Sequence, residues 1–422
     1  SQHGGQGALF SLAPVPFSEG LFSKILLWGE AKHMRLENKV IAVTGGADGI
    51  GRALAFGAAR EGAAAVLADI DAAKLRAAKE TYPSLETYEN YEELIEKADT
   101  DTIIIAVPHP LHAKVGIFAF AHGKNVLTEK PMDISLSAAE QLCAAAKKSG
   151  KLFGIMLNQR TSKLFTEARR IVQSGELGQL KRSIWIVTNW YRTNAYYASG
   201  AWRASWKGEG GGLLLNQAAH NLDLWQWICG MPVSVTAHCN VGKFHDIEVE
   251  DEAVLYTEFA NGATGVFITT TGDLPGTNRL EIVGTLGKIV IEGGTLKHWK
   301  LPKSEREICA DAPESCPRVE SEYTEYTPGN GRAHAGILQN YANALLHGEA
   351  LIAPGYDGLM QITLINAAYL SAWSGSAKVT LPFDKALYDK LLAEKIAHSS
   401  FRSEVKPLAE DKEQSNRWQV NW

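Results

Sequence analysis

The sequence predicts an α/β protein in which a doubly wound parallel sheet is followed by an α+β domain with a large, open and mostly antiparallel sheet. Residues 39–44, 64–68, 101–107 and 125–128 are short apolar segments that alternate with helix-like segments, as parallel strands and their crossover helices do. After Arg160 the strand-like segments follow one another directly, and Asn261-Gly262 between two of them is a strong hairpin signal. Residues 302–330 are charged, rich in Pro, Ser and Glu, and aperiodic, so we expect a long surface excursion there. The length of 422 residues also favours two domains over a single core.

The composition is that of an ordinary globular protein and gives no support to several functional classes. Hydrophobic residues make up 45% of the chain and charged residues 21%. The net charge of −5 provides no electrostatic basis for binding nucleic acid or an anionic membrane surface. No apolar segment reaches the length of a membrane span. The five cysteines form no CxxC pair, so we expect reduced thiols and a cytoplasmic protein.

A strand, a glycine turn, a helix and a second strand lie in direct succession near the start of the first domain. The strand at 39–44 precedes the glycine turn, and the second strand ends at Asp69. Glycines let the backbone approach a pyrophosphate, and the helix N-terminus offers it unpaired N–H groups. Asp69 would accept hydrogen bonds from the ribose and would repel a 2′-phosphate, which favours NAD over NADP. The predicted contacts of this Rossmann-like unit are Gly45, Gly49, Ile50, Gly51 and Asp69.

The spacing from Thr44 to Gly51 resembles the glycine turn of the short-chain dehydrogenases. That resemblance ends near residue 80, and the sequence lacks the Tyr-x-x-x-Lys pair on which that family's chemistry depends. The cofactor loop therefore resembles that of one family without its catalytic residues.

Two later loops contain reactive side chains at the ends of predicted parallel strands. Pro108-His109-Pro-Leu-His112 follows the strand at 101–107, and Glu129-Lys130-Pro131 follows the strand at 125–128. Open α/β sheets bind ligands at the carboxyl ends of their strands. We therefore expect Lys130 beside the reactive end of a bound cofactor.

With the segment Gly210–Asp223, these loops resemble the glucose–fructose oxidoreductase, inositol dehydrogenase and MocA (Gfo/Idh/MocA) family over about residues 85–400. The turn within residues 35–80 departs from the GxGxxG-like turn usual in that family. The resemblance implies an NAD(P)-dependent oxidoreductase acting on CH–OH groups, and a homodimer or homotetramer formed through one face of the open sheet. The implied cofactor contacts are Pro108, His109, His112, Glu129 and Lys130, although either histidine could instead cap its loop.

The segment Leu213–Cys229 has the pattern of a helix, on which Asn216, His220 and Asp223 would share one face. This face either forms a buried polar network that orients the helix or lines the cleft between the domains. For alcohol oxidation, His220 is the candidate acid/base, and the Lys130 ammonium would stabilise the developing alkoxide. The family often has aspartate where this chain has Asn216, and the amide can orient groups but cannot carry a proton.

Aromatic and arginine side chains precede this helix and suggest a carbohydrate substrate. Tyr191, Trp202 and Arg203 could stack on a sugar and hydrogen-bond its hydroxyls, or they could simply be core and interface residues. Together with Asp223 and Arg160 they are the predicted substrate contacts. Together with the family resemblance, this segment leads us to expect a sugar, a polyol or a glycoside, oxidised at a secondary carbon such as C3 of a glycosyl unit.

No metal site is predicted. His109 and His112 lack a third ligand nearby. The cluster of acidic residues and histidine before a later strand is better explained as an acidic loop; its members are His245, Asp246, Glu248, Glu250 and Asp251.

These patterns divide the chain into a dinucleotide-binding domain at 34–158 and a substrate-binding and oligomerisation domain at 159–422. Residues 1–33 do not resemble the rest, and we expect them to be a leader or a fusion-derived segment. Two other functions stay open. One is an NAD-dependent cleavage of glycosides through transient oxidation, and the other is a nucleotide-binding sensor without catalysis.

Overall fold

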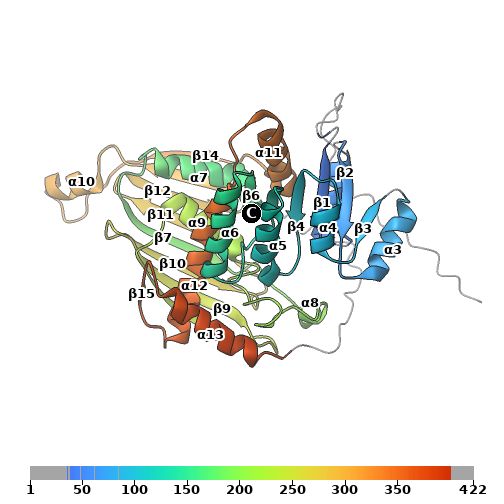
Figure 1. Cartoon of the computed structure of the whole chain (residues 1–422). Coiled ribbons are helices and arrows are strands. Elements are labelled where there is room, and N and C mark those ends of the chain that lie inside the picture. Colours follow the sequence, from blue (N-terminus) through green and yellow to red (C-terminus); the bar gives the residue numbers. More distant parts are fainter. Residues whose placement is uncertain (1–35, 37–38, 48, 61, 84, 401–422) are drawn as a thin grey trace, which may run out of the picture.

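The structure is a computed structural model and describes residues 36, 39–47, 49–60, 62–83 and 85–400. The expected leader at 1–33 lies outside these residues. The described chain forms one six-stranded sheet and one nine-stranded sheet, which lie side by side with helices between and around them (Figure 1). In this part of the chain, no helix combines the length and apolar character needed to cross a membrane.

The first sheet is parallel throughout and has the strand order β3-β2-β1-β4-β5-β6. Its strands are β1 (Val40–Thr44), β2 (Ala64–Ala68), β3 (Glu86–Tyr88), β4 (Thr102–Ile105), β5 (Asn125–Thr128) and β6 (Phe153–Ile155). The connecting helices are α2 (Gly49–Arg60), α3 (Ala72–Thr81), α4 (Tyr91–Lys97), α5 (His112–Ala121) and α6 (Leu136–Ser149). The order reverses between β1 and β4, which creates the crevice where doubly wound sheets bind their ligands.

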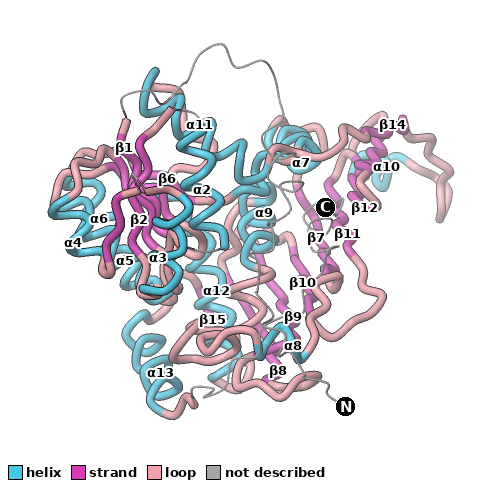
Figure 2. Tube along the Cα trace, turned by 90° about the vertical axis from the view of Figure 1, so that its right-hand side faces the viewer, coloured by secondary structure: helices cyan, strands magenta, loops and turns pink. Residues whose placement is uncertain are grey.

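Helices cover both faces of this sheet, as its apolar strands require. Figure 2 shows α2 and α3 on one side of the strands and α4, α5 and α6 on the other. The predicted doubly wound Rossmann-like architecture is therefore confirmed. The short strand β3 was not anticipated, because three half-exposed residues carry no clear alternation of apolar and polar side chains.

The second sheet has the order β14-β13-β12-β11-β7-β10-β9-β8-β15. Its strands are β7 (Leu180–Val187), β8 (Ser234–Val241), β9 (Glu250–Glu258), β10 (Thr264–Thr270), β11 (Asn278–Gly284), β12 (Gly287–Glu292), β13 (Thr295–Lys300), β14 (Glu322–Tyr326) and β15 (Val379–Thr380). The pairing of β10 with β7 is parallel and the others are antiparallel, so the predicted mostly antiparallel sheet is confirmed. The expected hairpin at Asn261-Gly262 joins β9 to β10, and Gly262 has a φ of +82°.

The polar segment 302–330 was expected to be an aperiodic surface excursion, and this was wrong in part. It contains α10 (Glu305–Asp311) and the strand β14, which pairs with β13 at the edge of the sheet. Every residue of β14 is exposed, so the strand has no buried face and its sequence has no apolar pattern that would predict it.

The remaining α-helices of the described chain all follow β6 in sequence. They are α7 (Lys163–Gln173), α8 (Asn194–Ala198), α9 (Ala219–Cys229), α11 (Ala333–His347), α12 (Gly358–Trp373) and α13 (Lys385–Ala397). Helix α11 lies far along the chain but packs on the first sheet, where Leu338, Tyr341 and Ala342 line a small cavity with Ile41 and Ile104. One layer of the dinucleotide domain is therefore supplied by the C-terminal part of the chain.

Candidate active site

The glycine turn after β1 has a backbone that only glycine could form. Gly45 has a φ of +68°, and a Cβ there would lie 2.3 Å from the carbonyl oxygen of Ala106. A Cβ on Gly51 would lie 2.2 Å from the carbonyl oxygen of Gly45. Gly49 has a φ of +53°, opens α2 and faces open space. The turn thus brings bare backbone and a helix N-terminus to the crevice, which fits a dinucleotide pyrophosphate. The exposed side chain of Ile50 flanks it.

Asp69 lies directly after β2 and is bonded to the same turn. Its Oδ2 accepts a hydrogen bond from the amide of Ala47 at 3.1 Å, and its Oδ1 accepts one from the amide of Asp71 at 3.0 Å. Each carboxylate oxygen can accept a second bond. Half-buried Asp69 therefore retains capacity for ribose hydroxyls at the position the sequence predicted.

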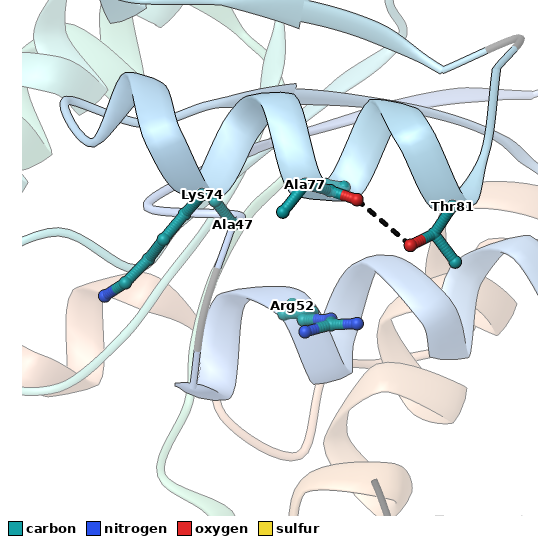
Figure 3. Close-up of a pocket in the computed structure, with 6 residues that line it drawn as sticks. Ala47, Arg52, Lys74, Ala77 and Thr81 are labelled. Carbon is teal, nitrogen blue, oxygen red and sulfur yellow. Dashed lines mark hydrogen bonds between the residues drawn. The ribbon is translucent and has the colours of Figure 1, made fainter. Parts of the chain in front are cut away.

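A hollow between α2 and α3 adjoins this turn. It is lined by Ala47, Arg52, Lys74, Ala77, Ala78 and Thr81. Figure 3 shows Arg52 between the two helices and Lys74 extending past one end. None of the lining residues belongs to the cluster around Lys130, and Ala47 places the hollow beside the glycine turn.

The two histidines after β4 fix loops to one another. His112 is buried, and its Nδ1 and Nε2 lie 2.6 Å and 2.7 Å from the carbonyl oxygens of Pro131 and Val107. His109 Nδ1 lies 3.1 Å from the carbonyl oxygen of Glu209. Burial lowers the pKa of both imidazoles. Of the two roles left open, the geometry favours capping for His112, while His109 joins the first domain to the loop before α9. Pro108 starts the short turn that carries both histidines.

Lys130 leaves the end of β5 and points toward the second domain. Its Nζ donates a hydrogen bond of 2.9 Å to the backbone carbonyl of Asn216. Burial lowers the pKa of this ammonium, and the nearby carboxylates of Glu129 and Glu209 act in the opposite direction. The structure therefore brings Lys130 and Asn216 together, although they are far apart in sequence.

The sequence did not predict that Glu209 lies in the reactive cluster, and the same is true of His334. Glu209 is 3% exposed, accepts a hydrogen bond of 2.7 Å from the amide of Ala204, and accepts another from the side-chain amide of Asn216. Burial raises the pKa of its carboxyl group, and the nearby Lys130 counteracts that shift. The only available signal was its place before the glycine run 210–212, which does not reveal burial.

His220 lies in the first turn of α9, and its Nδ1 is buried without a hydrogen-bond partner. Burial lowers the pKa of this imidazole well below its usual value, and Lys130 and His334 lower it further. Glu129 lies in the same cluster, with its Oε1 3.8 Å from Nε2 of His334, and burial raises its pKa to about 7. A neutral imidazole that is not held in a hydrogen bond by the described residues, and that lies near an ammonium, can accept a proton from a bound hydroxyl.

Two details of the predicted reactive helix need correction. Helix α9 begins at Ala219, not at Leu213, so Asn216 lies in the turn before it and shares no helical face with His220. The predicted substrate contacts of Asp223 and Arg160 do not fit the geometry either. Nε and Nη2 of Arg160 donate to the Asp223 carboxylate at 2.9 Å and 2.7 Å, and both side chains are almost completely buried. Their charged groups bind each other and are closed to a ligand.

The acidic residues just before β9 and at its start hold loops in place. Both oxygens of Glu250 accept hydrogen bonds from backbone amides of Gly212 and Leu214, while Asp251 accepts several from the turn 243–245. Glu248 accepts one from the amide of Trp206. Within the part of the chain that the structure describes, no group of His, Cys, Asp and Glu has the arrangement of a metal site.

The predicted aromatic and arginine residues lie beside this cluster. The Trp202 ring lies 6.1 Å from the His109 ring, and the Arg203 guanidinium stacks on Trp202 at 4.5 Å. The backbone carbonyl of Tyr191 accepts a hydrogen bond from Arg192. The arrangement fits the predicted role of Trp202 and Arg203 at the substrate end of the crevice, and for Tyr191 that role stays a prediction.

Two family models match the chain. The NAD-binding Rossmann-fold model of the GFO/IDH/MocA oxidoreductase family matches residues 41–157, and the model of that family's C-terminal domain matches residues 165–290. Together they cover more than half of the sequence.

Curated relatives are similar at a lower level. The scyllo-inositol 2-dehydrogenase (NAD(+)) of Bacillus subtilis is 27% identical over 214 residues, which cover 49% of this chain and 58% of that protein. The trans-1,2-dihydrobenzene-1,2-diol dehydrogenase of Xenopus laevis is 26% identical over 286 residues, covering 67% of this chain and 81% of that protein. The match thus spans little more than half the length of the first of these relatives.

Solved structures share the fold over most of the chain. The WlbA dehydrogenase from Chromobacterium violaceum in complex with NADH and UDP-GlcNAcA has a TM-score of 0.69 and 26% identity, covering 82% of this chain and 96% of that chain. Levoglucosan dehydrogenase in complex with NADH and levoglucosan, at 20% identity and a TM-score of 0.65, has the same fold. Because the models of both domains match, the chain belongs to the Gfo/Idh/MocA oxidoreductase family.

Proposed function

We propose that this protein is an NAD-dependent oxidoreductase that removes a hydride from a secondary alcohol of a sugar, polyol or glycoside. The observation that carries the proposal is the cluster at the end of β5, where Lys130 from the first domain donates a hydrogen bond to the carbonyl of Asn216 from the second and is near enough to His220 to lower its pKa. One cluster thus holds a cation and a neutral base at the end of a dinucleotide crevice.

NAD, when bound, supplies the hydride acceptor. Gly45, Gly49 and Gly51 would hold its pyrophosphate, and Asp69 would hold the adenosine ribose. The negative charge of Asp69 would disfavour a 2′-phosphate, so we propose a preference for NAD over NADP.

Within this cluster, one side chain accepts the proton of the substrate and another stabilises the developing negative charge. The neutral, half-buried imidazole of His220 accepts the hydroxyl proton of the substrate, and no described residue holds its buried Nδ1 in a hydrogen bond that would compete. The Lys130 ammonium stabilises the negative charge that grows on the substrate oxygen. Asn216 fixes Lys130 through its carbonyl and Glu209 through its side chain.

The names of the similar proteins support an alcohol on a ring as the substrate. The relative from Bacillus subtilis is named for scyllo-inositol, and the Chromobacterium enzyme was solved with NADH and UDP-GlcNAcA. Trp202 offers a ring surface of the kind that packs on a sugar. Oxidation at C3 of a glycosyl unit is our more specific proposal within this class.

A panel of sugars, inositols and glycosides with NAD and with NADP tests the proposal. The absorbance of reduced nicotinamide would be followed for the wild type, Lys130→Ala and His220→Ala. Each substitution should lower kcat/KM by roughly 10²- to 10⁴-fold, because each removes a group that acts on the transferred proton or the developing charge. Unchanged activity in both variants would refute the assignment.

Two further outcomes identify the alternatives. Release of an aglycone from a chromogenic glycoside without net reduced nicotinamide would indicate glycoside cleavage through transient oxidation. Binding of NAD without turnover on any member of the panel would indicate a nucleotide-binding sensor.

A further inference from the structure

Arg192 and Arg203 form a second cationic group next to the reactive cluster. Both guanidinium groups lie over the ring of Tyr196, at 4.9 Å and 4.5 Å from its centroid. Nη1 of Arg203 donates a hydrogen bond of 2.8 Å to the Tyr196 hydroxyl, which also accepts one of 3.1 Å from Gln217. Gln217 directly follows Asn216, whose carbonyl holds Lys130, so the two cationic groups are only a few contacts apart.

Within the described part of the chain, each of these arginines keeps one edge of its guanidinium, formed by Nε and Nη2, without a hydrogen-bond partner. Nη1 of Arg192 donates to backbone carbonyls, and Nη1 of Arg203 donates to a hydroxyl. Nε of both residues is buried and makes no hydrogen bond. Among the described residues, no carboxylate lies within ion-pair distance of either guanidinium. Because a buried donor without a partner is costly, both edges favour binding of an acceptor from outside the chain.

A third arginine of this protein shows which kind of group binds to the Nε and Nη2 edge of a guanidinium. Arg160 uses its Nε and Nη2 to hold the carboxylate of Asp223 through two parallel hydrogen bonds. This edge matches the two coplanar oxygens of a carboxylate. Arg192 and Arg203 present the same pair of nitrogens without a carboxylate of the protein.

The charges around Lys130 are consistent with an anion in this place. The guanidinium groups of Arg192 and Arg203 are near enough to lower the pKa of Lys130, while Glu129 and Glu209 raise it. Three cations thus face two buried carboxylates. An anionic group on the substrate would balance the excess positive charge and would direct the rest of the substrate toward Lys130.

We propose that Arg192 and Arg203 recognise a carboxylate of the substrate, so that the preferred substrates are sugar acids such as uronates or aldonates. This inference rests on the proposed oxidation of a carbohydrate alcohol and specifies its substrate class. The oxidised carbon and the carboxylate would lie at opposite ends of the substrate, between Lys130 and the two arginines.

The experiment compares a hexuronate, its uncharged methyl ester, the corresponding neutral aldose and its 6-phosphate. Both kcat/KM with NAD and the dissociation constant for NAD-loaded protein, by calorimetry, would be measured. The uronate should be preferred over its ester by roughly 10- to 100-fold, as expected for charge-assisted hydrogen bonds. Arg192→Gln and Arg203→Gln should each remove most of this preference, so that the ratio of kcat/KM for the uronate to kcat/KM for its ester falls toward unity. Arg170→Gln on the exposed face of α7 is the matched control and should change nothing.

The outcomes separate this inference from the proposed function. Oxidation of neutral sugars with no preference for the uronate would overturn the inference and leave the proposed function standing. Tight binding of the uronate that depends on both arginines, without turnover, would support the inference and refute the oxidoreductase. Preference for the 6-phosphate would overturn the carboxylate assignment. Arg203→Lys retains the charge but lacks the two-donor edge, so full activity of a well-folded Arg203→Lys variant on the uronate would also contradict the proposal.

Discussion

Glu209 gives the reactive cluster a carboxylate that the amide of Asn216 cannot provide. Asn216 donates its side-chain amide to Glu209 and its carbonyl accepts from Lys130, so the three residues form one connected group. The carboxylate of Glu209 acts against burial and raises the pKa of Lys130. We infer that this group keeps Lys130 charged in a setting that otherwise favours the neutral amine.

Substitution of Glu209 by glutamine should therefore change the pH dependence of the reaction. Activity requires the Lys130 ammonium and is lost as the pH rises through the pKa of Lys130. Loss of the Glu209 charge lowers that pKa, so the alkaline limb of kcat/KM should move to lower pH. A pH profile of the wild type, Glu209→Gln and the surface control Glu167→Gln measures the shift. An alkaline limb that stays in place in Glu209→Gln would show that Glu209 has only a structural role.

The short turn at Asn158–Thr161 and helix α9 are held together by the buried pair of Arg160 and Asp223. Asp357 adds a further carboxylate to Arg160, and Gln226 donates to Asp223 at 3.1 Å. Because α9 carries His220, this pair fixes the position of the proposed base relative to the turn that follows β6. The two side chains thus act on the site by positioning it.

Removal of one partner of this pair should destabilise the protein strongly. Arg160→Met leaves the Asp223 carboxylate buried without its cation, which costs about 3–5 kcal/mol. Asp223→Leu leaves Arg160 with only the half-exposed carboxylate of Asp357 and should also be destabilising. The double variant should recover much of that loss, because both charges are then absent. Urea unfolding of the four proteins gives the coupling free energy. Single variants that lose less than about 1 kcal/mol would contradict a tightly coupled pair.

The elements that the sequence predicted well are those with strong burial patterns. The apolar strands β1, β4 and β5 and the Asn261-Gly262 hairpin have local signals that tertiary contacts reinforce. The exposed edge strand β14 and the start of α9 lack such signals. The residues at 213–218 are almost all buried in an irregular turn, so their apolar character resembled that of a helix.

The same distinction holds for the candidate site. Lys130 and Asp69 lie at the ends of strands, and His220 lies on a helix, as the sequence predicted. The partners of charged groups could not be predicted, because Glu209 reaches Asn216 through a loop fold and Arg160 reaches Asp223 across 63 positions of the chain. Sequence spacing shows which groups share an element and does not show which groups neutralise each other.

After most of the second sheet the chain returns to pack on the first sheet, and this contact links the two parts of the molecule. Helix α11 packs where Tyr341 lies against Gly154 of β6, and Leu338 lies near Gly57 of α2. Tyr341 is 4% exposed. The dinucleotide sheet therefore has one face completed by residues that follow the second sheet in sequence.

Substitution of Tyr341 by alanine should destabilise both domains. Removal of a buried aromatic side chain costs about 3–5 kcal/mol. We expect a lower midpoint of thermal unfolding, together with weaker NAD binding as the first sheet loosens. His347→Ala at the exposed end of the same helix is the control and should stay within about 0.5 kcal/mol of the wild type. A Tyr341→Ala protein with unchanged stability would mean that α11 is dispensable to the first sheet.

The return of α11 also decides how such a protein can be recombined. An exchange of residues 34–158 with another cofactor domain would replace β1, β4 and β6 but leave their covering helix matched to the old surface. A functional hybrid would have to carry α11 along, or find a donor whose strands accept it. The natural unit of exchange is therefore discontinuous in the gene, although it is contiguous in space.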